Sequence, residues 1–463
     1  MDEKTAKRIS ANRHRVPPKP KYENGVIIHN DTLMSIDYSC EKVIIPPNIT
    51  RTQCGSVSQV KCLEISSIDL LEKFADLPKK LILHEPNLFG TDDTDLFNID
   101  NAAKINKTLK TLGLVGMEWL ELDGNEHFTT KDGILYTKDM KSLIRCPRSR
   151  TGKIIIPNGV RYINREAFYY CKIEDIVLPD SIEAIGEQAF YSCRLLKHAD
   201  FGNGLKSIGN EAFSRCYSLN FVDIPESVKL IKHEAFYECD KLKDIGLHNG
   251  IERIEDAAFC SCAAEKITLP DSLQYLGKYN FNKTNCVYLS HIPNGFMQAF
   301  AEEGWYTNKE RQTVLELHMG EDVIYIPQSL SYNGRNEIES MLKKANKDVY
   351  WSTFLYANEG NSKLYSALYT YLSGKQNQKL VEFLKIKEKD MSKELLISGH
   401  IKELSSFLQT GFVNKETFFE LLDMIDNNKT YNIQTENISV VKAYIIQAIS
   451  NDNKEKTEKF QLP

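Results

Sequence analysis

The chain has 463 residues, of which 42% are apolar, enough for a folded protein of about two to four domains. Its 58 Lys and Arg residues stand against 63 Asp and Glu residues, so the formal net charge is -5 and no strong positive field draws in nucleic acid or an anionic membrane. No run of about 18 apolar residues occurs, which excludes a membrane-spanning helix.

Residues 1–23 form a polar, basic arm, which we interpret as a disordered tail. It has no apolar segment of the kind found in a secretory signal, so we expect a cytoplasmic protein with reduced cysteines. A secreted or cell-surface protein that had lost its leader is the alternative. Contact with nucleic acid or lipid through the arm is the less favoured interpretation of its basic side chains, Lys4, Lys7, Arg8, Arg13 and Arg15.

Residues 24–131 carry weak strand patterns. Short apolar segments occur at 24–50, and fragments such as Leu81-Ile82-Leu83 and Leu120-Glu121-Leu122 fit a buried strand. We interpret this region as a degenerate N-terminal part, or cap, of a repeat domain.

A period of 22 or 23 residues dominates residues 132–290. Each unit has a short alternating segment, often closed by Pro, which removes a ladder donor and ends a strand. Because one unit of about 23 residues buries too little apolar surface to fold alone, the units must stack. The sequence predicts an α/β solenoid with a ribbon of parallel strands backed by turns or short helices. The aromatic that marks each unit is Phe168, Phe190, Phe213, Phe236, Phe259 and Phe281.

Units such as LPDSIEAIGEQAFYSC and IPESVKLIKHEAFYEC resemble the BspA-type leucine-rich repeats, strongly over residues 153–283. The stretch at 132–160 is similar to the hairpin-like inserts that open a block of such repeats. The resemblance implies a leucine-rich repeat ribbon. BspA-type proteins are commonly surface or secreted adhesion proteins, so it also implies recognition of proteins or host matrix.

A column of cysteines lies three residues after five of the phenylalanines. Strand spacing of about 4.8 Å would permit disulfides between neighbours, but a reducing compartment favours core thiols that act as small apolar groups. Metal binding or redox sensing is the alternative. The column is Cys171, Cys193, Cys216, Cys239 and Cys262.

No metal-ligand spacing, nucleotide-binding glycine motif or nucleophile elbow is present in the sequence. We therefore predict no catalytic, cofactor-binding or metal-binding residues, no cofactor and no enzymatic activity. Gly202-Asn203-Gly204 lies in a repeat turn, where we interpret glycine as permitting the backbone conformation.

The strand alternation places a further set of side chains on the outside of the ribbon. This face is acidic with an exposed aromatic ring, which suits a basic or mixed protein surface. An ordinary solvated face is the alternative, because charged residues on exposed strands need no function. The predicted partner-binding residues are Asp175, Val177, His198, Asp200, Phe221, Asp223 and Asp244.

Residues 291–335 read as a transition with a last strand at 323–327. Over residues 336–463 apolar residues lie three and four apart, which predicts an all-α domain of amphipathic helices with short connections. The stretch 394–426 resembles an ankyrin-like helix pair, with a loop at Gly399 and a helix end at Gly411. That resemblance implies an interaction domain.

Together these patterns predict a protein-protein interaction module that presents a rigid solenoid surface to a protein partner. Two alternatives stay open. One is an enzyme or effector whose activity lies in the helical domain and is targeted by the repeats. The other is a self-assembling scaffold or surface adhesin. Neither the partner nor the oligomeric state follows from the sequence.

Overall fold

The computed structural model describes residues 21–85, 116–300, 314–358, 360–427, 439–447 and 449. Most of the predicted basic arm therefore lies outside the described residues. The chain forms two compact units, Met1–Asp244 and Ile245–Pro463. Among the residues described, no helix is both long enough and apolar enough to span a bilayer.

The first unit begins with coils that lack the Phe–Cys signature. Two strands form a hairpin, the second of which pairs in parallel with a third: β1 (Val26–His29), β2 (Thr32–Ile36) and β4 (Arg51–Thr52). A separate all-parallel sheet follows, in the order β3 (Val43–Ile44), β5 (Cys62–Ile65), β6 (Lys80–Leu83) and β7 (Trp119–Leu122). The two strand fragments expected at 81–83 and 120–122 are parts of β6 and β7.

A short helix, α2 (Ile68–Leu71), lies among the described residues of this region. The side chain of Ser67 accepts a hydrogen bond from the Leu70 backbone N–H and so caps its N-terminus. Leu63, Leu81 and Leu120 are buried, so the degenerate region has an apolar core of its own.

A β-hairpin separates this region from the regular repeats, as the resemblance implied. β8 (Phe128–Lys131) and β9 (Ile134–Thr137) are antiparallel and joined through Asp132 and Gly133, both with positive φ. Left-handed residues at both central positions are typical of the tight hairpin turn that matches strand twist. β9 pairs with β10 (Ser142–Arg145), which then starts a parallel ladder.

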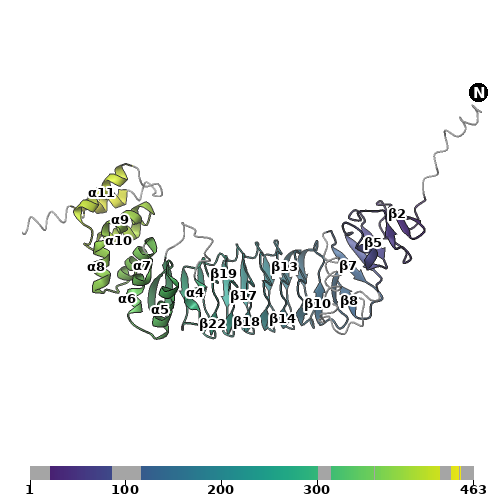
Figure 1. The fold of residues 1–463 in the computed structure, drawn as a ribbon, viewed down its shortest axis with the longest axis horizontal. Coiled ribbons are helices and arrows are strands. Elements are labelled where there is room, and N and C mark those ends of the chain that lie inside the picture. The colour runs from purple at the N-terminus through teal and green to yellow at the C-terminus, as the bar shows by residue number, and fades with distance from the viewer. Residues whose placement is uncertain are drawn as a thin grey trace, which may run out of the picture. The chain divides into compact units, whose positions relative to one another are not determined.

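Each regular coil of the first unit has three sides, and each side is hydrogen-bonded to the next coil. Figure 1 shows the strands of successive coils stacked beside one another. The longest side is a parallel ladder of β11 (Thr151–Ile155), β13 (Lys172–Val177), β15 (His198–Asp200) and β17 (Phe221–Ile224). The second side is a ladder of two-residue strands that follows β10: β12 (Tyr162–Ile163), β14 (Ala184–Ile185), β16 (Ser207–Ile208) and β18 (Leu230–Ile231).

The third side consists of turns around the repeat phenylalanines, which settles the choice between turns and short helices in favour of turns. The backbone N–H of Phe168 donates to the carbonyl of Ala189, and Phe190 donates to Ala212, both at 2.7 Å. Flanking residues such as Glu166 and Tyr170, with φ of 56° and 59°, adopt the left-handed conformation. That conformation costs a non-glycine residue about 1–2 kcal/mol, and the hydrogen bonds between coils hold it in place.

The repeat phenylalanines of the first unit stack inside the coils, as expected. Their ring centroids lie 4.7, 4.7 and 5.2 Å apart along the series, and the ring planes are within 9° of parallel. The rings are Phe168, Phe190, Phe213 and Phe236, and all four are fully buried.

The glycines at 202 and 204 serve a purpose different from the one that the sequence suggested. Neither has a positive φ, so backbone freedom does not explain them. A Cβ at Gly204 would lie 2.0 Å from the carbonyl oxygen of Asp180, and one at Gly202 would lie 2.2 Å from that of Pro179. Glycine is required here because the preceding coil approaches too closely for any side chain.

The second unit continues with the same construction. β20 (Arg253–Ile254) pairs in parallel with β22 (Tyr275–Leu276), and Phe259 and Phe281 stack with centroids 5.5 Å apart. The column goes on to Phe300, 5.9 Å from Phe281, which follows the short helix α4 (Phe296–Ala299). The repeat pattern did not reveal this last ring.

The long side of the second unit ends in a hairpin. β21 (Lys266–Thr268), β23 (Cys286–Tyr288) and β24 (Val314–Met319) are parallel, and β24 turns back into β25 (Asp322–Pro327). The last strand expected at 323–327 is thus β25. It lies antiparallel to β24, whereas the repeat pattern predicted only parallel pairing.

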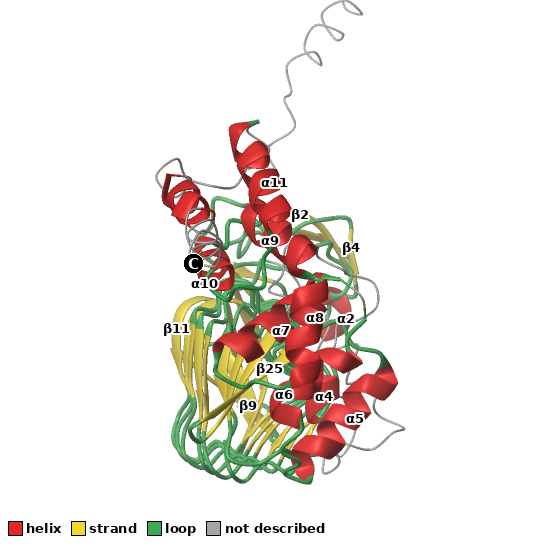
Figure 2. Cartoon of the chain, turned by 90° about the vertical axis from the view of Figure 1, so that its left-hand side faces the viewer, coloured by secondary structure: helices red, strands yellow, loops and turns green. Residues whose placement is uncertain are grey.

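Helices make up most of the remaining described residues of the second unit (red in Figure 2), as the apolar spacing predicted. Leu368, Leu395 and Phe407, from three different helices, are fully buried in their common core. Gly399 and Gly411, with φ of 75° and 72°, follow the ends of two helices at the positions expected. The elements are α5 (Tyr332–Lys343), α6 (Val349–Ser352), η1 (Thr353–Tyr356), α7 (Asn361–Leu372), α8 (Gln378–Ile386), α9 (Glu388–Ile397), α10 (Ile401–Leu408) and α11 (Lys415–Asp426), and residues 439–447 are also helical.

Candidate functional site

The predicted partner-binding residues lie on the solvent side of the long ladder, which we call the outer strand face. Parallel pairing places Asp175 beside His198 and His198 beside Phe221, and it places Val177 beside Asp200. Because side chains alternate along a strand, the neighbouring residues Ile176, Ala199 and Val222 point inward and are buried. The outer strand face is therefore a surface in which each side chain has a fixed neighbour.

The residues paired across the outer strand face also have partners on β11, which the sequence analysis missed. Lys153 is the register partner of Asp175, and Ile155 is that of Val177. Ile155 is 67% exposed and Phe221 is 47% exposed. The sequence did not identify Ile155 as exposed, because three consecutive isoleucines, Ile154-Ile155-Ile156, show no alternation of apolar and polar residues.

Charges on this face are arranged in opposite pairs at one end and as carboxylates at the other. Asp175 Oδ1 lies 2.7 Å from Nδ1 of His198, which makes an ion pair when the imidazole is protonated. Beside it, Lys197 forms an ion pair with Glu174 at 2.7 Å. Asp200 and Asp223 add two exposed carboxylates to this face.

The predicted partner-binding residues differ in solvent exposure. Asp175 and Val177 are only half-exposed, whereas His198, Asp200, Phe221 and Asp223 are exposed. Asp244 is also exposed, as the first residue of β19 (Asp244–Leu247) and the last of the first unit. The structure thus places Asp175, His198 and Phe221 side by side, with Val177 and Asp200 as a second row.

A second surface, which the sequence analysis missed, lies on the turn side of the same coils. Tyr169 and Tyr191 stack with centroids 5.2 Å apart, and Tyr170 packs edge-on against Tyr169 at 4.6 Å. The guanidinium of Arg148 lies over Tyr169 at 5.5 Å, and that of Arg215 lies over Tyr191 at 5.8 Å. We call these five residues the tyrosine–arginine strip.

The strip has the composition of a protein-binding hot spot, since Tyr and Arg are enriched there. Its rings are partly withdrawn from water, and burial raises the pKa of Tyr169 and of Tyr191. The sequence signal for this strip is a pair of tyrosines directly after Phe168 and one tyrosine directly after Phe190. It occurs in only part of the repeats, so a search for regular columns passes over it.

The cysteine column lies inside the coils and bonds one coil to another. The thiol of Cys216 donates to the carbonyl of Phe190 at 3.2 Å, and that of Cys239 donates to Phe213 at 3.2 Å. Burial raises the pKa of Cys193 and of Cys216, so these thiols stay protonated at neutral pH. The nucleophile is the thiolate, so these protonated thiols are poor nucleophiles, in agreement with the interpretation as core groups.

Comparison with protein families gives one result. The family described as BspA type leucine rich repeat region (6 copies) matches residues 148–239 and 206–301. A comparison with curated proteins finds no match.

Several solved structures are similar to this chain at low sequence identity. A leucine rich cell surface protein from Faecalibacterium prausnitzii A2-165 is 20% identical with a TM-score of 0.35, and the match covers 57% of this chain and 63% of that one. A leucine-rich repeat protein from Bacteroides ovatus ATCC 8483 is 18% identical with a TM-score of 0.36, over 59% of this chain and 63% of that one. A leucine rich repeat protein of T. pallidum is 22% identical with a TM-score of 0.26, over 36% and 74%. The chain thus spans less than two thirds of the length of the first two.

The three-sided coils, the stacked phenylalanines and the family match agree over the same part of the chain. Residues 148–301 are a BspA-type leucine rich repeat region, followed in this chain by a helical C-terminal region.

Proposed function

We propose that the repeat region is a protein-binding module whose contact surface is the outer strand face. The observation that carries this proposal is the register of Asp175, His198 and Phe221 on three neighbouring strands. A surface fixed by backbone ladders loses little conformational freedom when a partner binds, so more of the contact energy appears as affinity.

The exposed apolar groups supply the attraction. Ile155 and Phe221 are exposed although their strand neighbours are buried, and burial of each under a partner would contribute about 1.5–3 kcal/mol. The carboxylates of Asp200 and Asp223 lie on the same face, so the partner that fits best has an apolar patch bordered by basic side chains. Such charges mainly accelerate association and select the partner.

The helical region supports a binding role more than an enzymatic one. Its buried carboxylate, Glu388, accepts hydrogen bonds from Thr417 at 2.9 Å and from Asn414, at the start of α11. This is the use of a carboxylate as a helix-terminus anchor. Because the family match is to a repeat region, we propose that the protein is not an enzyme. We also propose a reducing, cytoplasmic location, and the cell surface is the alternative that the family implies.

The test uses the full chain as bait in a lysate of the native cells, with captured proteins quantified by mass spectrometry. The double variant Ile155→Ser/Phe221→Ser removes the two exposed apolar groups of the outer strand face. The control, Tyr170→Ser, removes a ring of similar exposure from the tyrosine–arginine strip. We expect the double variant to capture at least about tenfold less of one protein than the parent does, equivalent to about 1.4 kcal/mol of binding free energy. The control should capture the same amount as the parent.

Circular dichroism of both variants establishes that the coils remain folded. Loss of the same captured protein with Tyr170→Ser, and its retention with the double variant, would move the contact surface to the tyrosine–arginine strip. Retention with both variants would exclude either face as the main contact.

A further inference from the structure

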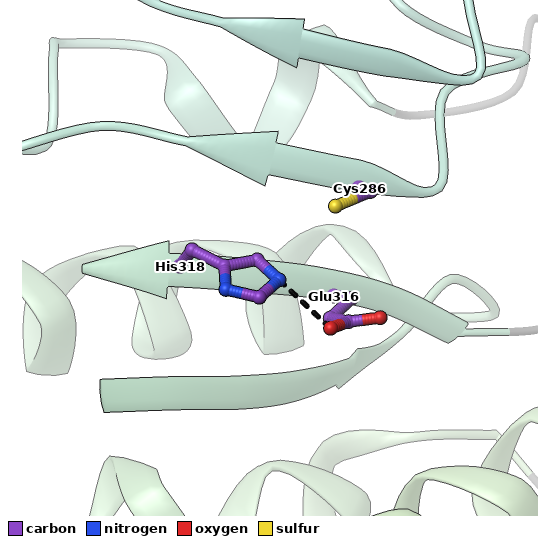
Figure 3. A group of neighbouring side chains, drawn as sticks. All are labelled: Cys286, Glu316 and His318. Atoms are coloured by element: carbon purple, nitrogen blue, oxygen red, sulfur yellow. Dashed lines mark hydrogen bonds and ion pairs between the residues drawn. The ribbon is translucent and has the colours of Figure 1, made fainter. Parts of the chain in front are cut away.

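Three side chains of the kinds that bind transition metals meet on β23 and β24 in the second unit. One ligand atom from each of Cys286, Glu316 and His318 lies within 4.8 Å of the other two (Figure 3). The strands are parallel and adjacent, with Cys286 beside Glu316 and Tyr288 beside His318. Residues two apart on a strand share a face, so the register itself brings the three groups together.

Neighbouring groups hold the imidazole in position. The ring of His318 stacks on that of Tyr288 with centroids 4.4 Å apart and planes 19° from parallel. Its Nε2 lies 2.7 Å from Oε1 of Glu316, as the dashed line in Figure 3 marks. An imidazole fixed by stacking and by a carboxylate has little rotational freedom left to lose when it binds an ion.

The three groups differ in burial in a way that suits a site reached from solvent. Cys286 is buried, at 5% exposure, and so forms the floor. The side chains of His318 and Glu316 are 21% and 41% exposed and border the opening. An ion can therefore reach the thiol past the other two ligands.

We propose that Cys286, Glu316 and His318 bind one divalent transition-metal ion, for which Zn²⁺ is the best match. A thiolate, an imidazole and a carboxylate are the three ligand types that Zn²⁺ takes from proteins. The sulfur excludes Mg²⁺ and Ca²⁺, which bind through oxygen. Three protein ligands leave the fourth tetrahedral position to water.

The three side chains must adjust their positions to bind an ion. Around a tetrahedral ion with bonds of about 2.0–2.3 Å, ligand atoms lie roughly 3.3–3.7 Å apart. The imidazole and carboxylate, now 2.7 Å apart, must separate slightly, and the thiol already lies within 4.8 Å of both ligand atoms. The ion then replaces the hydrogen bond between His318 and Glu316, and the thiol of Cys286 releases its proton to solvent.

The sequence analysis predicted no metal-binding residues because no local spacing reveals this group. Glu316 and His318 are two apart on one strand, and Cys286 comes from the preceding strand of the sheet. The three positions become a set only when the register of β23 and β24 is known. Cys286 also lies outside the repeat cysteine column.

The test is a titration of the full chain with Co²⁺ after treatment with a chelator, followed by absorption in the near ultraviolet and visible. A cobalt–thiolate bond gives a charge-transfer band, and tetrahedral cobalt gives intense visible bands. We expect both bands to saturate at one ion per chain and to disappear on addition of Zn²⁺. Cys286→Ser should abolish the thiolate band, and His318→Gln or Glu316→Gln should weaken binding by at least about tenfold.

Two controls match the ligands in kind but lie elsewhere. Cys54→Ser removes a thiol that is more exposed than that of Cys286, and His400→Gln removes an imidazole that is 3.9 Å from the carboxylate of Glu403. Both should bind cobalt as the parent does. Zn²⁺ should also raise the Tm of the parent and of both controls but not that of Cys286→Ser. Absence of the thiolate band, or its persistence in Cys286→Ser, would overturn the proposal.

Discussion

The thiol of Cys193 donates a hydrogen bond to the carbonyl oxygen of Phe168, 3.0 Å away in the preceding coil. The next pair, Cys216 and Phe190, repeats the contact at 3.2 Å. Each bond requires the neutral S–H form, and burial raises the pKa of both thiols above the ordinary value of about 8.5. The folded coils therefore retain protons that the unfolded chain releases in alkali.

Stability should fall as the pH rises above about 8.5, because the unfolded chain then loses thiol protons while the folded chain keeps them. Below that pH both states are protonated and the contribution is fully present. Cys193 and Cys216 each add about 1.4 kcal/mol to the loss for every pH unit above 8.5. Urea unfolding between about pH 7 and pH 10 measures the slope, and Cys216→Ala should reduce it by one thiol's share.

The control for this prediction is Ser214→Ala, which removes a buried hydroxyl from the same coil but no titrating group. It should shift the unfolding curve by the same amount at every pH. Equal slopes for Cys216→Ala and the parent would contradict the assignment of the pH dependence to the thiol.

Gly204→Ser should destabilise the protein, although Ser occupies the corresponding position in neighbouring coils. There, Ser181 and Ser227 donate hydrogen bonds to the carbonyls of Val160 and Leu205, at 2.8 and 2.7 Å. At Gly204 the new Cβ would instead meet the carbonyl oxygen of Asp180 at 2.0 Å. We expect a loss of about 1–3 kcal/mol in the free energy of unfolding, measured with urea.

Gly55→Ala is the matched substitution for Gly204→Ser, because a Cβ at Gly55 would have no atom within 4 Å. It should leave the urea midpoint nearly unchanged. If Gly204→Ser is as stable as the parent, the close approach of the two coils is not what requires glycine.

Ser192→Gly should stabilise the protein. Ser192 has φ of 54°, and its buried hydroxyl has no hydrogen-bond partner among the described residues. Glycine removes both costs and keeps the backbone N–H that donates to Ser214 at 2.8 Å. After the greater entropy of glycine in the unfolded chain is deducted, we expect a net gain of about 0.5–1 kcal/mol.

Thermal unfolding of Ser192→Gly and Ser192→Ala separates the two contributions. Alanine also removes the hydroxyl but keeps a Cβ in the left-handed conformation, so its gain should be smaller. A larger gain for alanine than for glycine would show that backbone conformation contributes nothing at this position.

The repeat coils could be predicted from sequence because their buried columns recur. Phe168, Phe190 and Cys193 each occupy a position where every coil needs the same volume, so the same residue type returns at a fixed interval. In β5, β6 and β7 the coils are also parallel, but their buried Leu63, Leu81 and Leu120 lie at unequal intervals. Without a period, four-residue strands leave too weak a signal to identify a repeat.

Surface features were predictable only where strand alternation determines them. Alternation placed Asp175, His198 and Phe221 on one face, and their register confirms that they are neighbours. Their role in partner binding stays a prediction, as does the ankyrin-like character of the helices at 394–426. The tyrosine–arginine strip and the Cys286 group depend on which coil lies beside which. That information is absent from any single segment.

The antiparallel strand β25 determines how the sheet of the second unit ends. β25 is the outermost strand of its sheet, yet its outer side is occupied. The hydroxyl of Thr353 donates to the carbonyl of Tyr325 at 2.6 Å, and the ring of Tyr369 packs on that of Tyr325 at 5.6 Å. A bare strand edge would be a template on which other chains could polymerise. The contacts of η1 and α7 with Tyr325 cover part of this edge strand and so hinder such pairing.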